Sequence, residues 1–122
     1  MIGEHIKTIH ATITAKNPTK LAEWYKDTLG IKIGVKLLKE GRPPVYFLKL
    51  KNGCEIEIHP FVKQHIGVVV DDFDKVAEKL KAKGIQLTDV QHTSGGWKIG
   101  FFKDTEGNLL ELQHRPKGTP QI

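Results

Sequence analysis

Two histidines and two glutamates of this chain have a spacing that could support metal chemistry. His10 precedes Glu57 by 47 residues and His65 precedes Glu111 by 46 residues, so the same pair of residue types recurs at nearly the same interval. Imidazole nitrogens and carboxylate oxygens together suit a divalent cation such as Ni²⁺, Zn²⁺, Mn²⁺, Co²⁺ or Fe²⁺. A cation would also relieve the repulsion between two buried carboxylates. We predict that these four residues bind one divalent metal ion and leave two adjacent coordination positions for oxygens of a substrate.

The sequence around these residues is duplicated. The segment 10–31, HATITAKNPTKLAEWYKDTLGI, aligns with 65–85, HIGVVVDDFDKVAEKLKAKGI, when one residue is dropped near the helix end. Further along, 52–59 aligns with 106–114, which places Glu57 opposite Glu111. A duplication of this kind predicts two modules with one shared fold. Taken singly, a strand histidine is more often a structural residue and a strand glutamate more often solvated, so the matching repeat positions carry the metal prediction.

Each half carries the same order of secondary-structure signals. A strand is predicted at 6–15 and at 64–70, and helix N-caps follow at Asn17 and Asp72. Gly30 and Gly84 are expected to end the two helices in the left-handed conformation. The predicted apolar helix faces are Leu21, Trp24, Tyr25 and Leu29 in the first half and Phe73, Val76, Ala77 and Leu80 in the second. The remaining strands are predicted at 32–38, 45–51, 55–59, 86–91, 97–103 and 109–114.

These elements predict an α+β fold. The chain would be a single domain of two βαβββ modules, at about 5–62 and about 63–115, followed by a loose tail at 116–122. In each module the histidine lies on the first strand and the glutamate on the last, and strand alternation puts the glutamate on a polar face. We expect the polar faces of the two modules to form one cleft. Candidate substrate-binding residues in this cleft are Thr12, Tyr46, His59, Trp97 and Gln113.

The composition narrows the functional classes. With 39% hydrophobic and 27% charged residues, the 122-residue chain has the make-up of an ordinary globular domain. Its net charge of +5 comes from lysines spread along the sequence, so nucleic-acid binding is not expected. The N-terminus lacks the apolar core of a signal peptide, and the longest apolar stretch, 66–70, is too short to cross a membrane. The single cysteine, Cys54, cannot form an internal disulfide, and a cytoplasmic location is expected.

Three segments resemble the vicinal oxygen chelate superfamily, which unites glyoxalases, bleomycin-resistance proteins and dioxygenases. They are 10–31, 65–85 and GWKIGFFKDTEGNLLELQHRP at 96–116, and together they cover more than half of the chain. The resemblance implies paired βαβββ modules around a half-barrel cleft, with metal ligands from the first and last strands of each module. The four predicted ligands fall on those positions. The resemblance also implies a homodimer, since small members of this superfamily usually pair.

Within that superfamily, the His/Glu/His/Glu set is most similar to that of glyoxalase I. The resemblance implies a metal-dependent lyase or isomerase that moves a proton on a small-molecule substrate chelated through adjacent oxygens. Glu111 would be the leading catalytic base and Glu57 its counterpart, while the ion would stabilise the developing oxyanion. Methylmalonyl-CoA epimerases use the same logic, but they usually have glutamine at the position of Glu57.

Two other functions stay open on the sequence. One is a metal-free protein that binds a drug or another small ligand, as some relatives in this superfamily do. The other is an iron-dependent ring-cleaving dioxygenase, although the two His and one Glu of those enzymes do not match a set with a fourth ligand. Glyoxalase I binds the carboxylates of glutathione through arginines, and this chain has only Arg42 and Arg115. The use of glutathione is therefore left open.

Overall fold

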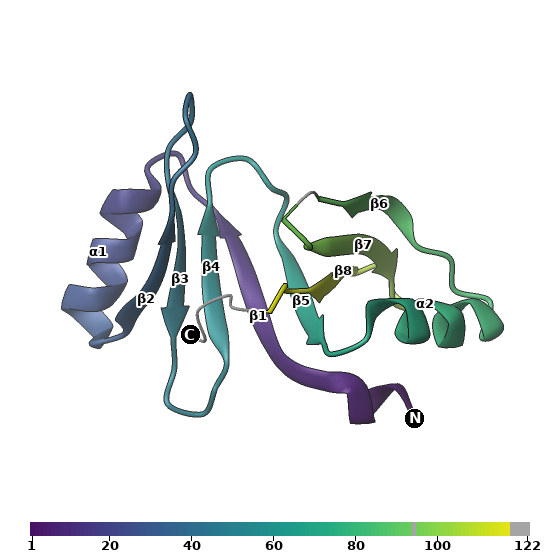
Figure 1. The fold of residues 1–122 in the computed structure, drawn as a ribbon. Coiled ribbons are helices and arrows are strands. Elements are labelled where there is room, and N and C mark those ends of the chain that lie inside the picture. Colours follow the sequence, from purple (N-terminus) through teal and green to yellow (C-terminus); the bar gives the residue numbers. More distant parts are fainter. Residues whose placement is uncertain (94, 118–122) are drawn as a thin grey trace. The chain divides into compact units, whose positions relative to one another are not determined.

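The computed structural model describes residues 1–93 and 95–117, and its elements follow the order of two successive βαβββ modules (Figure 1). A short 3-10 helix, η1 (Ile2–His5), precedes the first strand. The first half contains β1 (Ile6–Thr14), α1 (Pro18–Leu29), β2 (Lys32–Leu37), β3 (Val45–Lys49) and β4 (Glu55–His59). The second half contains β5 (His65–Val70), α2 (Phe73–Ala82), β6 (Thr88–His92), β7 (Lys98–Lys103) and β8 (Leu109–His114). The predicted α+β class is confirmed.

Strand pairing is the same in the two halves. The order of hydrogen-bonded neighbours is β2-β3-β4-β1 in the first half and β6-β7-β8-β5 in the second. Neighbours are antiparallel except for β4 with β1 and β8 with β5, which are parallel. Each histidine strand therefore lies directly beside the glutamate strand of its own half. Because paired strands put residues of one face side by side, this topology brings the predicted ligands together within a half.

The chain divides into two compact units, and the division does not fall between the two halves of the sequence. Among the described residues, one unit contains His10–Gln64, and the other combines Met1–Ile9 with residues 65–93 and 95–117. The N-terminal segment joins the second unit through η1, which packs against α2. The backbone N–H of Asp71 also donates a hydrogen bond to the carbonyl of His5. His10 and Glu57 therefore belong to one unit, and His65 and Glu111 belong to the other.

The helix ends follow the capping signals of the sequence. Asn17 and Asp72 each accept a side-chain hydrogen bond of 3.1 Å from the backbone N–H three residues further on. Gly30 caps α1 with a left-handed φ of 70°. In α2 the last cap is Lys83, and Gly84 follows it with a φ of 82°. The two helices thus begin and end within a residue of the positions predicted from local chemistry alone.

The sheet-facing surface of α1 differs in part from the prediction. Ala22 is fully buried against β3 and β4, with Leu21 and Tyr25 packed around it. Trp24 and Leu29, however, are 52% and 58% exposed, so the predicted apolar face was wrong at these two positions. Trp24 is two residues after Ala22, about 200° around the helix axis, and so points away from the sheet. Leu29 is the last helical residue.

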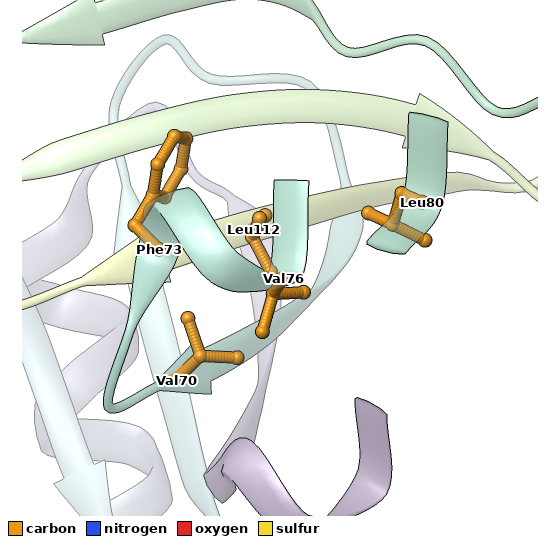
Figure 2. Packing of buried hydrophobic residues seen from close by; sticks show 5 residues of the cluster. All are labelled: Val70, Phe73, Val76, Leu80 and Leu112. Carbon is orange, nitrogen blue, oxygen red and sulfur yellow. The ribbon is translucent and has the colours of Figure 1, made fainter. Parts of the chain in front are cut away.

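The core of the second unit matches the prediction more closely. Figure 2 shows the side chains of Val70, Phe73, Val76, Leu80 and Leu112, which form one buried cluster between α2 and the strands β5 and β8. Burial of each such side chain contributes roughly 1.5–3 kcal/mol. The helical residues of this cluster were all predicted from their spacing. In the described part of the chain, neither helix is long and apolar enough to cross a membrane.

The strand bounds differ from the prediction mainly at β6. This strand covers Thr88–His92 instead of 86–91. Its pairing with β7 is irregular between Thr88 and Gln91, and Asp89 has a φ of 51°. A backbone irregularity of this kind interrupts the alternation on which strand prediction relies. Residue 94, between the strands predicted at 86–91 and 97–103, and the part of the predicted tail from 118 to 122 lie outside the described residues.

Candidate functional site

In the first half, the predicted ligands His10 and Glu57 lie on one face of the parallel strands β1 and β4. The strand register pairs Thr12 with Glu57, and His10 shares their face because it is two residues before Thr12. His10 Nε2 lies 3.2 Å from Glu57 Oε1, and Thr12 Oγ1 donates a hydrogen bond of 2.8 Å to the same oxygen. The three side chains are buried, with 1%, 9% and 3% exposure for His10, Glu57 and Thr12. Protein groups, and not bulk water, therefore orient this carboxylate.

In the second half, His65 and Glu111 repeat this arrangement on β5 and β8. The register pairs Gly67 with Glu111, and His65 is two residues before Gly67. His65 Nε2 lies 3.6 Å from Glu111 Oε1, and both side chains are buried. Gln113 Nε2 donates a hydrogen bond of 3.3 Å to Glu111 Oε1, and Gln113 Oε1 accepts one of 2.8 Å from Arg115 Nε. A chain of hydrogen bonds thus leads from Arg115 to the glutamate.

An aromatic residue stands beside each pair, and sequence reasoning missed both of them. Phe47 pairs in register with Glu57, and Phe101 pairs with Glu111. Each phenyl ring meets the histidine ring of its own half edge to face, at centroid distances of 6.1 Å and 5.5 Å. The two phenylalanines are 54 residues apart, as are the two glutamates, so this shared interval could have identified both phenylalanines from the sequence. Apolar walls of this kind strengthen nearby electrostatic interactions because they keep water away.

The two pairs differ in the residue that donates to the glutamate. Opposite the first glutamate stands Thr12, whereas its counterpart opposite the second is Gly67, which has no hydroxyl to donate. In the second half the donor is Gln113 instead, two residues further along β8 and therefore on the same face of the strand. Its counterpart in the first half, His59, uses its Nδ1 to accept from the backbone of the loop that follows β4. The two halves therefore share the His/Glu pair and differ in the groups that form hydrogen bonds to its glutamate.

The remaining candidate substrate residues lie in different surroundings. Tyr46 pairs in register with Ile58 and packs in the buried cluster under α1, so its side chain is on the opposite face of the sheet from Glu57. Its hydroxyl lies 2.8 Å from Thr19 Oγ1. Trp97 is half-buried just before β7, with the Arg115 guanidinium 6.0 Å from its ring centre. Thr12 and Gln113 contact the predicted ligands directly, as described above.

Two carboxyl groups away from these pairs have perturbed pKa values. A hydrogen bond from the His5 ring lowers the pKa of the exposed Asp71 carboxyl below its usual value. The Asn108 side chain, together with the backbone of the turn before β8, lowers the pKa of Asp104 in the same way. Both effects come from hydrogen bonds that favour the charged form. They stabilise loops and are unrelated to the predicted ligands.

The chemistry of each pair fits a divalent cation. An imidazole Nε2 and a carboxylate Oε1 point at a common region, and these donors suit the borderline first-row ions. Partners such as Thr12 and Gln113 are typical of groups that orient metal ligands. Each pair supplies two metal-binding atoms, whereas zinc takes about four ligands and most of the other ions take about six. Neither pair is by itself a complete metal site.

Comparisons with known proteins address the fold and the family. The family model for the Glyoxalase/Bleomycin resistance protein/Dioxygenase superfamily matches residues 7–112. A comparison with curated proteins gave no match. A methylmalonyl-CoA epimerase from Mycobacterium tuberculosis is 17% identical with a TM-score of 0.66, and the similarity covers 92% of this chain and 88% of that one. A variant of the Streptomyces coelicolor methylmalonyl-CoA epimerase in complex with 2-nitronate-propionyl-CoA is 19% identical with a TM-score of 0.65, over 93% and 95% of the chains.

A third solved structure of similar fold is named for a different activity. It is a NAD-dependent benzaldehyde dehydrogenase from Legionella pneumophila, 16% identical with a TM-score of 0.69. The similarity covers 88% of this chain and 99% of that one. At identities this low the likeness shows the fold alone, and the fold by itself does not select one reaction.

Proposed function

Because the chain belongs to the Glyoxalase/Bleomycin resistance protein/Dioxygenase superfamily, we propose that it is a divalent-metal-dependent isomerase or lyase that moves a proton on a small-molecule substrate. The observation that carries this proposal is the repeated donor pair. In each unit a buried histidine Nε2 lies within 3.6 Å of a buried glutamate Oε1. We propose that one Ni²⁺, Zn²⁺, Mn²⁺, Co²⁺ or Fe²⁺ ion is bound by all four residues, since two ligands alone are too few.

The protein's own groups would carry out the proton transfer. When bound, the ion supplies stabilisation of the negative charge that develops on a substrate oxygen as the neighbouring carbon loses its proton. Glu111 takes that proton, while its hydrogen bond from Gln113 keeps the carboxylate in one orientation. Glu57, oriented by Thr12, is the second carboxylate, able to return a proton to the carbon. The electron pair of the broken C–H bond stays on the substrate and forms the new C–H bond when a proton returns, so no oxidant or reductant is needed.

The reaction to test first is proton exchange at a carbon next to a carbonyl. Two of the solved structures with this fold are named methylmalonyl-CoA epimerases, which favours this reaction class. The deciding assay incubates the metal-loaded protein with methylmalonyl-CoA in deuterated water and measures deuterium at the exchanging carbon. The hemithioacetal of methylglyoxal and glutathione serves as the second substrate, because the ligand set also resembles that of glyoxalase I. We expect metal-dependent turnover of one of the two.

Variants connect this activity to the residues. Glu111→Gln should abolish turnover while circular dichroism shows an unchanged fold, and Glu78→Gln on the exposed surface of α2 should leave turnover unchanged. Unchanged activity of Glu111→Gln would show that another group is the base. A wild-type protein that takes up neither Ni²⁺ nor Mn²⁺ after chelator treatment would favour the metal-free binding protein. Oxygen consumption with catechol by the Fe²⁺ form would favour the dioxygenase.

A further inference from the structure

The side-chain amide of Gln113 lies between a carboxylate and a guanidinium. Its Nε2 donates a hydrogen bond of 3.3 Å to Glu111 Oε1, and its Oε1 accepts one of 2.8 Å from Arg115 Nε. Gln113 and Glu111 are 3% and 5% exposed, so bulk water does not compete for these contacts. In the part of the chain that the structure describes, the Gln113 amide makes these two hydrogen bonds, one through each end.

These two neighbours allow the amide one orientation. A guanidinium has only N–H donors and an ionised carboxylate only acceptors, whereas a glutamine amide has both, at its two ends. Rotation of the amide by half a turn would bring Gln113 Oε1 toward the Glu111 carboxylate and Nε2 toward the Arg115 donors, and both hydrogen bonds would be lost. Leaving buried polar groups unpaired is costly. The bond from Arg115 is the shorter of the two, so Arg115 contributes most to holding the amide in place.

Arg115 itself is held by the antiparallel pairing of β7 with β8 (Figure 1). One residue beyond the last pair of that register, Trp97 stands beside Arg115. The guanidinium carbon lies 6.0 Å from the centre of the Trp97 ring, which is the geometry of a cation–π contact. A Cβ atom on Gly96 would lie 2.9 Å from Pro116 Cβ, so the two segments approach as closely as a glycine permits. The half-buried Arg115 side chain is therefore fixed from its aromatic side as well as through Gln113.

We propose that Arg115 is a positioning residue that acts on Glu111 through the Gln113 amide. Arg115 fixes the amide, the amide presents Nε2 to Glu111, and the carboxylate thereby keeps one orientation. We call these two hydrogen bonds the Arg115 relay. Its effect on the amide is independent of any metal, whereas its effect on metal affinity rests on the proposed function.

The relay belongs to the second half of the chain. The interval of 54 residues that relates Glu57 to Glu111 sets Phe61 against Arg115. The Phe61 side chain is a hydrocarbon and is 66% exposed, so it has no donor to offer to an amide or a carboxylate. The carboxylate of Glu57 is oriented instead by the hydroxyl of Thr12. The relay therefore distinguishes the two glutamates, and Arg115 should affect Glu111 alone.

The first test observes the Gln113 amide by NMR in full-length, ¹⁵N-labelled protein from which metal has been removed with a chelator. The chain contains five glutamines, and Gln113→Leu identifies the side-chain NH₂ signals of Gln113 by their loss. Arg115→Met removes the donor and keeps a long, unbranched side chain. Lys117→Met, at an exposed lysine two residues further on, removes the same charge and is the matched control.

In the wild type we expect the N–H of Gln113 that faces Glu111 to exchange slowly with water, because it is buried and hydrogen-bonded. Arg115→Met should shift both NH₂ signals and speed up this exchange by about tenfold or more, whereas Lys117→Met should leave them in place. In the reciprocal measurement, Gln113→Leu should shift the Nε–H signal of Arg115, since that N–H loses its acceptor. Unchanged Gln113 signals in Arg115→Met, or an unchanged Arg115 signal in Gln113→Leu, overturn the proposal.

The second test is a double-mutant cycle in which isothermal titration measures the affinity for Mn²⁺. Arg115→Met should weaken binding by about threefold or more, although loss of a positive charge by itself favours a cation, and Lys117→Met should bind at least as tightly as the wild type. In a Gln113→Leu background, Arg115→Met should change the affinity by less than about twofold, because the relay is already broken.

An equal loss of affinity in both backgrounds would overturn the relay, since Arg115 would then act without Gln113. A wild-type protein without affinity for Mn²⁺ would contradict the proposed function, and the NMR signals of the metal-free protein would still decide whether Arg115 fixes the Gln113 amide. The failure of the relay and the failure of the proposed function are therefore distinguishable.

Discussion

Replacing Thr12 by valine tests how much the hydrogen bond from Thr12 to Glu57 contributes to the metal affinity. The substitution removes the hydroxyl that donates 2.8 Å to Glu57 Oε1 and keeps the branched shape of the side chain. Thr12 and Glu57 are both buried, so water does not replace the lost donor. A hydrogen bond to a charged group contributes about 1.5–3 kcal/mol. At about 1.4 kcal/mol for each factor of ten, this predicts a loss of roughly 10- to 100-fold in affinity.

An independent magnitude agrees with this one, because removing the partner of a metal ligand typically costs about 10- to 100-fold in affinity. The assay is isothermal titration of chelator-treated protein with Mn²⁺ or Ni²⁺. Thr12→Ser, which keeps the hydroxyl, is the matched control and should bind within about threefold of the wild type, since it retains the hydrogen bond. Urea unfolding of the metal-free forms shows whether the valine variant is also globally less stable, by up to about 3 kcal/mol.

The result that would refute the reasoning is a Thr12→Val protein that binds metal as tightly as the wild type. It would mean either that Glu57 is not a metal ligand or that its metal affinity does not depend on the hydrogen bond from Thr12. A wild-type protein without metal affinity would instead contradict the proposed function, so the two failures are distinguishable.

Four further predictions follow from the described contacts. Gln113→Leu should also weaken metal binding, by roughly 10-fold or more, because Glu111 loses its donor; titration with Mn²⁺ checks this, and full affinity would show that the hydrogen bond is incidental. Leu112→Ala should lower the free energy of unfolding in urea by about 2–5 kcal/mol, whereas Leu38→Ala, at a residue 75% exposed, should change it by less than about 0.5 kcal/mol. Asn17→Ala should destabilise the protein by about 1 kcal/mol in the same assay, since Asn17 caps α1, and an unchanged midpoint would contradict the role of the cap. Asn108→Ala should raise the pKa of Asp104, which the hydrogen bond from Asn108 holds below 3.8. A carboxyl group with a lowered pKa stabilises the fold at pH values above its ordinary pKa, and this stabilisation is lost as the pH falls through the lowered pKa. The variant should therefore be less stable than the wild type at neutral pH and equally stable in strong acid, and an NMR titration of Asp104 checks the pKa.

Much of the fold could be predicted because its signals are local. The helix starts depend on Asn17 and Asp72, whose side chains bond to backbone groups three residues away. Glycine marks the helix ends because few other residues adopt a left-handed φ without strain. The duplication was visible because matching residues recur at matching intervals, and it led to the pairing of His10 with Glu57 and of His65 with Glu111 before any strand register was known.

Face assignments within β3 could not be predicted. Val45, Tyr46, Phe47 and Leu48 are all buried, so this strand has no alternation of polar and apolar residues to show which side faces the helix. A shift of one residue moves a side chain to the opposite face. Sequence reasoning selected Tyr46 as a candidate, whereas the register places Phe47 opposite Glu57. Only the pairing of β3 with β4 settles this choice.

The amino-acid sequence thus determines the two-module architecture, the capped helices and the identity of the repeated His and Glu pairs, since each depends on residues that are neighbours along the chain or copies of one another. The tertiary structure alone decides which groups support those pairs. Thr12 supports Glu57 across 45 residues, and Gln113 supports Glu111 across 2 residues. The first of these contacts depends on the register of β1 against β4, which hydrogen bonding and packing between distant segments set.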